Sequence, residues 1–349
     1  MLLNKILYLT LNISQAYSRF KSFGGLRLLR EYYRLGIVWA LVQKAVWCIV
    51  HRRSLKNVYA VVNDKVTPYL ENKYQELVPK ERGGFSESVS KKVWFCWLQG
   101  MNNAPYLVKA CYHSVCQYLP EREIVLIDEE NYHNYVEMPE FIVEKRKKGI
   151  IPAALFSDLL RLELLIKYGG TWIDSTVLMT DPKTLPTSLK VKGAKADGEG
   201  NLDSESGHPW LDGIMNADLF FFHYKDINKR FAGIGNWFIT AKPQHWVLVT
   251  IRNILYEYWK EHDCVLNYYI FHAMFNMIVK KHPEIIMAMP KRWAVPSLYL
   301  RDKLAMDFDA SFWQELTEHV CFHKLNYRKE GEAKSNKNSY LNKILQDIQ

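Results

Sequence analysis

The sequence predicts an α/β protein in which a largely parallel sheet follows a basic, helical N-terminal region. Segments typical of strands and helices alternate from about residue 91 onward, which is the pattern of right-handed strand-helix-strand units. The positive charge is concentrated before residue 57. We therefore expect a basic helical region over residues 1–90, an α/β domain over 91–328 and a polar tail over 329–349.

The composition provides for a large folded core. Of the 349 residues, 48% are hydrophobic, which excludes a globally disordered chain. The six cysteines form no CxxC pair and no zinc-like spacing, and several lie in apolar runs. We expect buried free thiols in a reducing compartment, and so a cytoplasmic location. These cysteines are Cys48, Cys96, Cys111, Cys116, Cys264 and Cys321.

The N-terminal region carries the charge of the whole chain. Residues 1–56 contain ten Lys or Arg residues and one acid, Glu31, a net charge of +9 that equals the net charge of the full sequence. A basic arm on a neutral body indicates a polyanionic partner, unless its basic face is merely solvated. No zinc-finger, helix-turn-helix or RNP-like signature accompanies the charge, so we expect an anionic membrane surface and no nucleic acid.

An apolar run in this arm suggests how it meets the membrane. Leu35–Val50 is interrupted by Gln43 and Lys44, and it is shorter than the roughly 20 apolar residues that a membrane-spanning helix needs. Apolar and aromatic residues beside arginines are typical of a helix that lies in the headgroup region. We therefore expect a peripheral protein on the inner face of the cytoplasmic membrane.

The body of the chain contains the elements of an α/β sheet. The expected strands are 91–97, 123–128, 171–179, 219–223 and 237–241, and the expected helices are 105–118, 131–148, 152–168, 244–260 and 265–280. Ligands of such sheets bind beyond the carboxyl ends of the strands. Trp97, Asp128 and Asp174 fall at or near those ends, so this edge is the predicted binding site.

Residues 152–180 combine a helix, a turn and a strand that together suggest a site. Asp158 and Arg161 are three residues apart on the helix, so both project from one side. Gly169-Gly170 supplies the left-handed conformation that ends a helix. On the following strand Trp172, Asp174 and Thr176 alternate onto one face. An acid within an apolar strand requires a partner, because an unpaired buried carboxylate is costly.

This combination resembles the capsular polysaccharide synthesis proteins of glycosyltransferase family 32. The matching motifs are Ser157-Asp158-Leu159-Leu160-Arg161, Gly169-Gly170 and Trp172-Ile173-Asp174, and the resemblance extends over roughly residues 90–330. It implies a GT-A-type, Rossmann-like nucleotide-sugar-binding domain. It also implies a glycosyltransferase that transfers a sugar from a nucleotide-sugar donor to a glycan acceptor, such as a lipid-linked oligosaccharide, with retention of anomeric configuration.

The resemblance also assigns roles to particular residues. Trp97 stands where the family stacks an aromatic ring on the nucleotide base, which suits a flat indole. Asp158 and Arg161 match residues that contact the donor sugar, and Arg161 also lies near the diphosphate, where a guanidinium fits phosphate oxygens. Asp158, Arg161 and Asp174 are therefore the expected catalytic residues.

The expected cofactor is a divalent metal, Mn²⁺ or Mg²⁺. Asp174 matches the first acid of the family's DxD motif, but Thr176 stands at the position of the second acid. The segment Cys321–Tyr327 matches the end of the family's catalytic domain, and it places His323 and Lys324 near the diphosphate or the metal. The expected metal ligands are Asp174, Thr176 and His323, since a hard cation accepts further oxygen ligands from diphosphate and water.

Two readings of the function remain open. The first is the active glycosyltransferase described above. The second is a catalytically inactive, glycosyltransferase-like protein that binds nucleotide sugar or glycan in an assembly complex, with which the threonine in the DxD motif is compatible. The polar segment 187–209 is either a surface loop or a lid that orders over the donor or acceptor.

Overall fold

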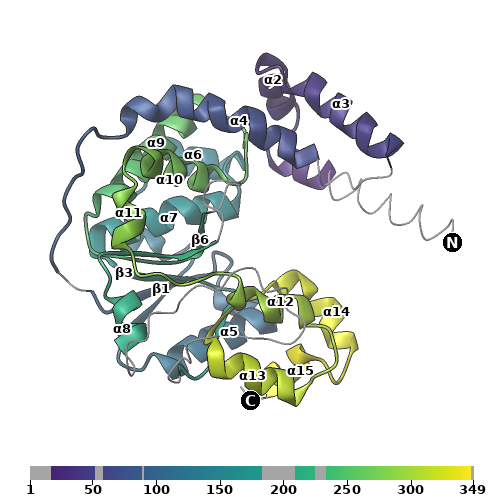
Figure 1. The fold of residues 1–349 in the computed structure, drawn as a ribbon, viewed down its shortest axis with the longest axis vertical. Helices are drawn as coiled ribbons and strands as arrows, with labels where there is room; N and C mark the ends of the chain where they lie inside the picture. Colours follow the sequence, from purple (N-terminus) through teal and green to yellow (C-terminus); the bar gives the residue numbers. More distant parts are fainter. Residues whose placement is uncertain (1–16, 52–57, 89, 183–208, 225–232, 347–349) are drawn as a thin grey trace. The chain divides into compact units, whose positions relative to one another are not determined.

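The computed structural model describes residues 17–51, 58–88, 90–182, 209–224 and 233–346 (Figure 1). The chain divides into two compact units. The first unit contains residues 1–80, 137–159 and 250–281, and the second contains 81–136, 160–249 and 282–349. The expected boundaries at residues 90 and 328 do not coincide with these units, because two segments from the body of the chain belong with the N-terminal helices.

The elements have the following bounds. The helices are α2 (Leu26–Arg34), α3 (Ile37–Val50), α4 (Val58–Tyr74), α5 (Tyr106–Tyr118), α6 (Glu140–Lys147), α7 (Ala153–Tyr168), α8 (Pro209–Met215), α9 (Trp246–Glu261), α10 (Ile270–Lys281), α11 (Glu284–Ala288), α12 (Tyr299–Lys303), α13 (Ala310–His319), α14 (Glu330–Ser335) and α15 (Tyr340–Gln346). The strands are β1 (Lys92–Cys96), β2 (Glu123–Ile127), β3 (Gly170–Asp174), β4 (Val177–Met179), β5 (Leu219–His223), β6 (Ile234–Ala241) and β7 (Phe322–Lys324). Short 3₁₀ turns are η2 (Gln75–Leu77), η3 (Met101–Asn103), η4 (Tyr132–Asn134), η5 (Pro296–Leu298) and η6 (Tyr327–Lys329).

The first unit is helical in the residues that the structure describes. Polar side chains connect its N-terminal helices to the segment around residue 262. The Tyr32 hydroxyl donates to the Leu266 carbonyl at 2.8 Å, and the Tyr74 hydroxyl donates to Glu261 Oε2 at 2.6 Å. These bonds explain why the arm belongs with residues 250–281 and not with a separate N-terminal domain.

Helices α2 and α3 of this unit leave much apolar surface exposed. Leu26 and Tyr33 on α2 are exposed, as are Trp39, Ile49 and Val50 on α3. No described helix is by itself long and apolar enough to cross a membrane. Helices α2 and α3 together match a membrane span in length and composition only, and the chain bends by 100° between them, where Gly36 adopts a left-handed φ of 66°.

The second unit contains a five-stranded sheet in the order β2-β1-β3-β6-β5. Strands β2, β1 and β3 run parallel, as the sequence predicts, whereas β6 and β5 are antiparallel to their neighbours. The unit is therefore an α/β unit with a mixed sheet, in which parallel and antiparallel strands occur together. Parallel pairing requires a long crossover connection, whereas antiparallel neighbours need only a hairpin-like return.

A large hydrophobic cluster lies on one face of this sheet. Apolar side chains from four strands alternate onto that face and form one buried cluster with residues of α5 and the C-terminal helices. The strand residues are Val93, Phe95, Ile173, Phe220 and Phe238. Figure 1 shows α5 and helices α12 to α15 on the same side of the sheet. Trp94 and Trp172, one residue out of phase, are buried on the opposite face.

The expected strand 171–179 is divided into two. β3 ends at Asp174, residues 175–176 form a turn, and β4 pairs with β7 in a separate two-stranded sheet. Asp174 and Thr176 are therefore not successive positions on one flat strand. The prediction was wrong because the apolar residues after Ser175 pack against the C-terminal segment, which the local pattern does not reveal.

Two expected helices begin later than the sequence suggests. The stretch 131–148 contains η4 and then α6, which begins directly after Pro139. Proline disfavours helical backbone at the residue before it, so the helix cannot begin earlier. The helix expected at 265 begins at Ile270, and before it the Asn267 side chain accepts from the Tyr269 N–H at 2.9 Å. Such local bonds compete with the helix.

The expected polar tail is in fact part of the core. Tyr340, Leu341 and Ile344 on α15 are buried in the same cluster as the inner face of the sheet. Their helical spacing forms an apolar face that a tail rich in Lys and Asn obscures. Of the six cysteines, five are buried free thiols as expected, and Cys116 is half-buried.

Candidate functional site

The carboxyl ends of the three parallel strands lie side by side. Cys96 at the end of β1 pairs with Ile127 of β2 and with Asp174 of β3. The residues expected at this edge, Trp97, Asp128 and Asp174, therefore do share it. The Asp128 carboxylate, however, accepts from the backbone N–H groups of Glu130 and Asn131, both at 2.9 Å, so it stabilises a local turn.

Two glycines set the angle between α7 and β3. Gly169 and Gly170 have φ values of +64° and +91°, which side-chain-bearing residues rarely adopt. A Cβ on Gly170 would lie 2.3 Å from the Lys92 carbonyl oxygen of β1. This close approach allows β3 to pair with β1 directly after the helix, and it brings the end of β3 near Arg161.

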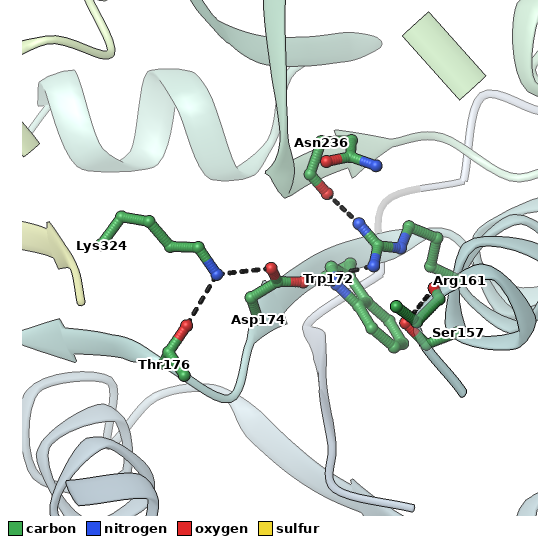
Figure 2. Close-up of polar contacts among 8 residues, drawn as sticks. Ser157, Arg161, Trp172, Asp174, Thr176, Asn236 and Lys324 are labelled. Atoms are coloured by element: carbon green, nitrogen blue, oxygen red, sulfur yellow. Dashed lines mark hydrogen bonds and ion pairs between the residues drawn. The ribbon is translucent and has the colours of Figure 1, made fainter. Parts of the chain in front are cut away.

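Arg161 is held against β3 and β6. Its side chain is 5% exposed, and Nη2 lies 3.3 Å from Asp174 Oδ1. Nη1 donates to the Asn236 carbonyl, and the guanidinium lies 4.8 Å from the centre of the Trp172 ring (Figure 2). Trp172 Nε1 also donates to Asp174 Oδ1 at 2.8 Å. The partner that Asp174 requires is therefore Arg161, and Trp172 lies on the same face of the strand.

Lys324 reaches the same carboxylate from the C-terminal strand. Its Nζ donates to Asp174 Oδ2 at 2.6 Å and to Thr176 Oγ1 at 2.7 Å (Figure 2). The pairing of β4 with β7 aligns Val177 with Lys324, which carries the lysine back to the turn after β3. Lys324 and Arg161 thus contact the two oxygens of one carboxylate.

The two cations keep Asp174 ionised. Burial alone would raise the pKa of this carboxyl group. The positive charges of Lys324 and Arg161, with hydrogen bonds from Lys324 and Trp172, outweigh burial and lower the pKa to about 2. A carboxylate with this pKa is ionised at neutral pH, so it forms charge-assisted contacts with both the Lys324 ammonium and the Arg161 guanidinium.

The expected metal ligands are not assembled into one set. Asp174 and Thr176 are brought together, but through the Lys324 ammonium. His323 is adjacent to Lys324 on a strand, so it projects to the other face, where Nε2 lies 3.1 Å from Thr180 Oγ1 and the ring stacks on Trp313. Complete burial lowers the pKa of His323 to about 3. Among the described residues, no three His, Cys, Asp or Glu side chains gather as a metal site.

Trp97 contacts the same C-terminal segment. Its ring meets the Tyr327 ring edge-on, with centroids 5.3 Å apart and planes at 87°. Within the segment 321–327, Lys324 therefore contacts the end of β3 while Tyr327 contacts the residue after β1. The segment 321–327 and the segment around Asp174 therefore lie together in the folded chain.

Two other expected features, Asp158 and the segment 187–209, are not part of the cluster of Arg161, Asp174 and Lys324. Asp158 is buried, one turn before Arg161 on α7, but it belongs to the first unit, and its role at the donor remains a prediction. The expected lid, residues 187–209, lies almost entirely outside the described residues. The Asn236 carbonyl, which the sequence analysis gave no role, contributes through its backbone, for which no side-chain pattern provides a signal.

A comparison with protein families agrees with the resemblance to capsular polysaccharide synthesis proteins. A family model described as capsular polysaccharide synthesis protein matches residues 46–344. Among solved structures, one described as "PaToxG Glycosyltransferase" is 10% identical over 81% of this chain and 94% of its own, with a TM-score of 0.35, which is too low to establish a shared fold. The search of curated proteins gave no match. Because the family model covers most of the sequence, the chain belongs to the capsular polysaccharide synthesis protein family.

Proposed function

We propose that the protein is a glycosyltransferase that transfers a sugar from a nucleotide-sugar donor to a glycan acceptor in capsular or surface polysaccharide synthesis. The observation that carries this proposal is the cationic cluster of Arg161, Asp174 and Lys324 at the carboxyl ends of parallel strands. That edge is where open α/β sheets bind ligands. The family membership of the chain supports the same assignment, and a GT-A-type domain is part of the proposal.

The cluster suits a nucleoside diphosphate. Its two cations meet at the end of β3, and Trp97 follows the last residue of the neighbouring strand β1, so the indole would stack on the base while Arg161 and Lys324 bind the diphosphate oxygens. Asp174 orients both cations, and we assign Asp158 and Arg161 to the donor sugar. A rigid guanidinium and an ammonium that are already oriented provide electrostatic stabilisation as negative charge develops on the leaving group.

The proposed reaction exchanges one bond at the anomeric carbon of the sugar. The bond from this carbon to the diphosphate oxygen breaks, and a bond to an acceptor hydroxyl oxygen forms. The hydroxyl proton passes to the departing phosphate. We propose retention of configuration by this same-face substitution, in which the diphosphate leaves with the electron pair.

One structural feature favours a second candidate function. Thr176 occupies the position of the second acid and hydrogen bonds to Lys324, which is compatible with a protein that binds nucleotide sugar or glycan without turnover. Incubation with a panel of nucleotide sugars separates the two. Slow release of nucleoside diphosphate that disappears in Asp174→Asn supports the transferase. Saturable binding without any release supports the binding protein.

We also propose that the first unit binds an anionic membrane surface. Exposed apolar residues of α2 and α3 lie beside the exposed Arg27 and Arg30. This combination fits the headgroup region, where the arginines would meet lipid phosphates and the apolar side chains would enter the acyl boundary. Such a position would suit a lipid-linked oligosaccharide acceptor.

A further inference from the structure

Lys324 occupies the position between the two oxygens that the DxD-like motif offers to a cation. Its Nζ lies 2.6 Å from Asp174 Oδ2 and 2.7 Å from Thr176 Oγ1. Both distances are short for bonds from an ammonium group, and the first is a charge-assisted contact. A protein-bound cation therefore already satisfies the carboxylate and the hydroxyl that were expected to bind a metal.

The backbone fixes this position. β7 pairs antiparallel to β4, and the Leu325 N–H donates to the Thr176 carbonyl at 2.8 Å. Residues on both sides of Lys324 are thus hydrogen-bonded to the strand that follows Asp174. The Lys324 side chain is only 21% exposed, so it is a built component of the site and not a mobile surface lysine.

The rest of the Asp174 carboxylate is also engaged. Oδ1 accepts from Trp172 Nε1 at 2.8 Å and lies 3.3 Å from Arg161 Nη2. A divalent ion at Asp174 would have to displace the ammonium and would then lie beside a buried guanidinium. The donors present therefore do not fit a metal bound directly by the protein, because like charges at close range repel strongly in a buried site.

We propose that the Lys324 ammonium takes the place of the divalent cation in this site, so that Lys324 and Arg161 bind the donor diphosphate without a metal ion. The inference rests on the proposed function, because it assumes a nucleotide-sugar donor. It assigns the task of charge neutralisation to a residue of the C-terminal strand, and it explains why Thr176 stands where a second acid would otherwise be required.

The direct test measures the binding of nucleoside diphosphates to the full-length protein by calorimetry. UDP, GDP, CDP, ADP and dTDP are titrated once in EDTA and once in Mn²⁺. We expect one of them to bind with the same affinity in both solutions. Binding that appears only with Mn²⁺ overturns the inference and leaves the proposed function standing. The absence of binding in both solutions counts against the proposed function, and the inference falls with it.

Variants of Lys324 identify the residue responsible. Lys324→Met should weaken the binding of the diphosphate by roughly 30-fold or more, since it removes one partner of a buried charge contact, and Lys324→Arg should restore part of it. The matched control is Lys329→Met, because Lys329 makes only a 3.9 Å contact to Asp302. Unchanged binding in a folded Lys324→Met protein would overturn the assignment.

Mn²⁺ alone gives a readout that needs no nucleotide. We expect the wild-type protein to leave the electron paramagnetic resonance signal of free Mn²⁺ unchanged. Thr176→Asp combined with Lys324→Ser supplies a second carboxylate and removes the ammonium, so this variant should reduce the signal. Mn²⁺ binding by the wild-type protein that Asp174→Asn abolishes would contradict the inference.

Discussion

Lys324 Nζ and Asp174 Oδ2 lie 2.6 Å apart although 150 residues separate them in the sequence. Arg161 contacts the other oxygen of the same carboxylate. One acid thus orients two cations that come from a helix before it and a strand far after it. The consequence is a site at the end of β3 in which both cations are already oriented.

Asp174→Asn should abolish transfer or donor hydrolysis while the protein remains folded. The amide oxygen of asparagine can still accept from Lys324, but it cannot balance the charges of both cations. We expect a loss of activity of about 100-fold or more and a decrease in the free energy of unfolding of about 1–3 kcal/mol. Product release and thermal unfolding followed by circular dichroism measure the two effects.

The control for this variant is Asp302→Asn, at an exposed carboxylate paired with Arg301. It should change neither quantity appreciably, because exposed ion pairs contribute little. Arg161→Ala should lose activity as Asp174→Asn does. An Asp174→Asn protein that retains full activity would refute the assignment of the site.

Trp97→Leu should weaken nucleotide binding because it removes the stacking surface. Stacking of a base on an aromatic ring contributes about 1–3 kcal/mol, so the dissociation constant should rise roughly tenfold. Trp97→Phe retains an aromatic ring and should lose much less. Equal affinities of the leucine and phenylalanine variants in a calorimetric titration would argue for a purely structural role beside Tyr327.

Gly170→Ala should destabilise the protein strongly. Its φ of +91° is unfavourable for alanine, and the added Cβ would meet the Lys92 carbonyl oxygen at 2.3 Å. We expect a loss of about 3 kcal/mol or more from the combined strain and overlap. Gly100→Ala is the matched control, since Gly100 has a φ of +75° but nothing within 4 Å of an added Cβ.

In the control only the backbone strain applies, so it should cost about 1–2 kcal/mol. Chemical denaturation of both variants under the same conditions gives the comparison. If the two variants were equally stable, the close approach of β3 and β1 at Gly170 would not be the reason for this glycine.

The protein should lose stability as the pH falls below about 6.5. Burial lowers the pKa of His245 to about 4, although the charge of Asp218 acts in the opposite direction. Between these pH values the unfolded chain binds a proton that the folded protein does not bind. The free energy of unfolding should therefore decrease by up to about 1.4 kcal/mol per pH unit from this residue.

His245→Phe removes this titration and keeps an aromatic ring to stack on Phe85, whose ring centre is 5.1 Å from that of His245. The variant should show a shallower loss of stability between pH 6.5 and 4. Part of the loss should remain, because burial also lowers the pKa of His223, His262 and His323. Identical pH profiles for the variant and the wild-type protein would contradict the prediction.

Replacement of Arg27, Arg30 and Arg34 by glutamine should release the protein from anionic vesicles. Each basic residue near an anionic leaflet contributes about 1 kcal/mol, so binding should weaken roughly 100-fold. Co-sedimentation with vesicles containing phosphatidylglycerol measures this. The control variant replaces Lys148, Lys260 and Lys280, which are also exposed, and it should bind as the wild-type protein does.

Apolar contacts are tested separately by Trp39→Ser with Ile49→Ser, which should lower binding even at high salt. If these changes abolish only self-association in solution, the apolar surface of α3 binds a second copy of the chain. Vesicle binding that survives both sets of substitutions would contradict the membrane proposal.

Much of the parallel part of the sheet could be predicted from the sequence. Continuous apolar runs and the Gly-Gly turn identify β1, β2, α7 and β3 because each is specified by neighbouring residues. The same local logic placed Trp97 and Asp174 at one edge, and the register of β1 with β3 confirms it. The sequence also predicted that Asp174 needs a partner, and the structure identifies it as Arg161 of the same helix-turn-strand unit.

The rest depended on contacts between distant residues. No spacing argument reveals that β4 leaves the sheet to pair with β7, and this pairing brings Lys324 to Asp174 and moves His323 away from it. The burial of Tyr340 in a segment rich in Lys and Asn likewise depends on its packing against the sheet. Such long-range partners decide which residues of a motif meet, whereas local patterns decide only which elements form.

The late position of β7 has a consequence for biosynthesis. A chain that stops before residue 322 would contain every strand of the five-stranded sheet but lack β7. Arg161 could still contact Asp174, but the contacts of Lys324 with Asp174 and Thr176 would be missing. If the proposed function holds, translation must pass residue 324 before the donor site can be completed, and copies truncated before β7 would bind the nucleoside diphosphate weakly.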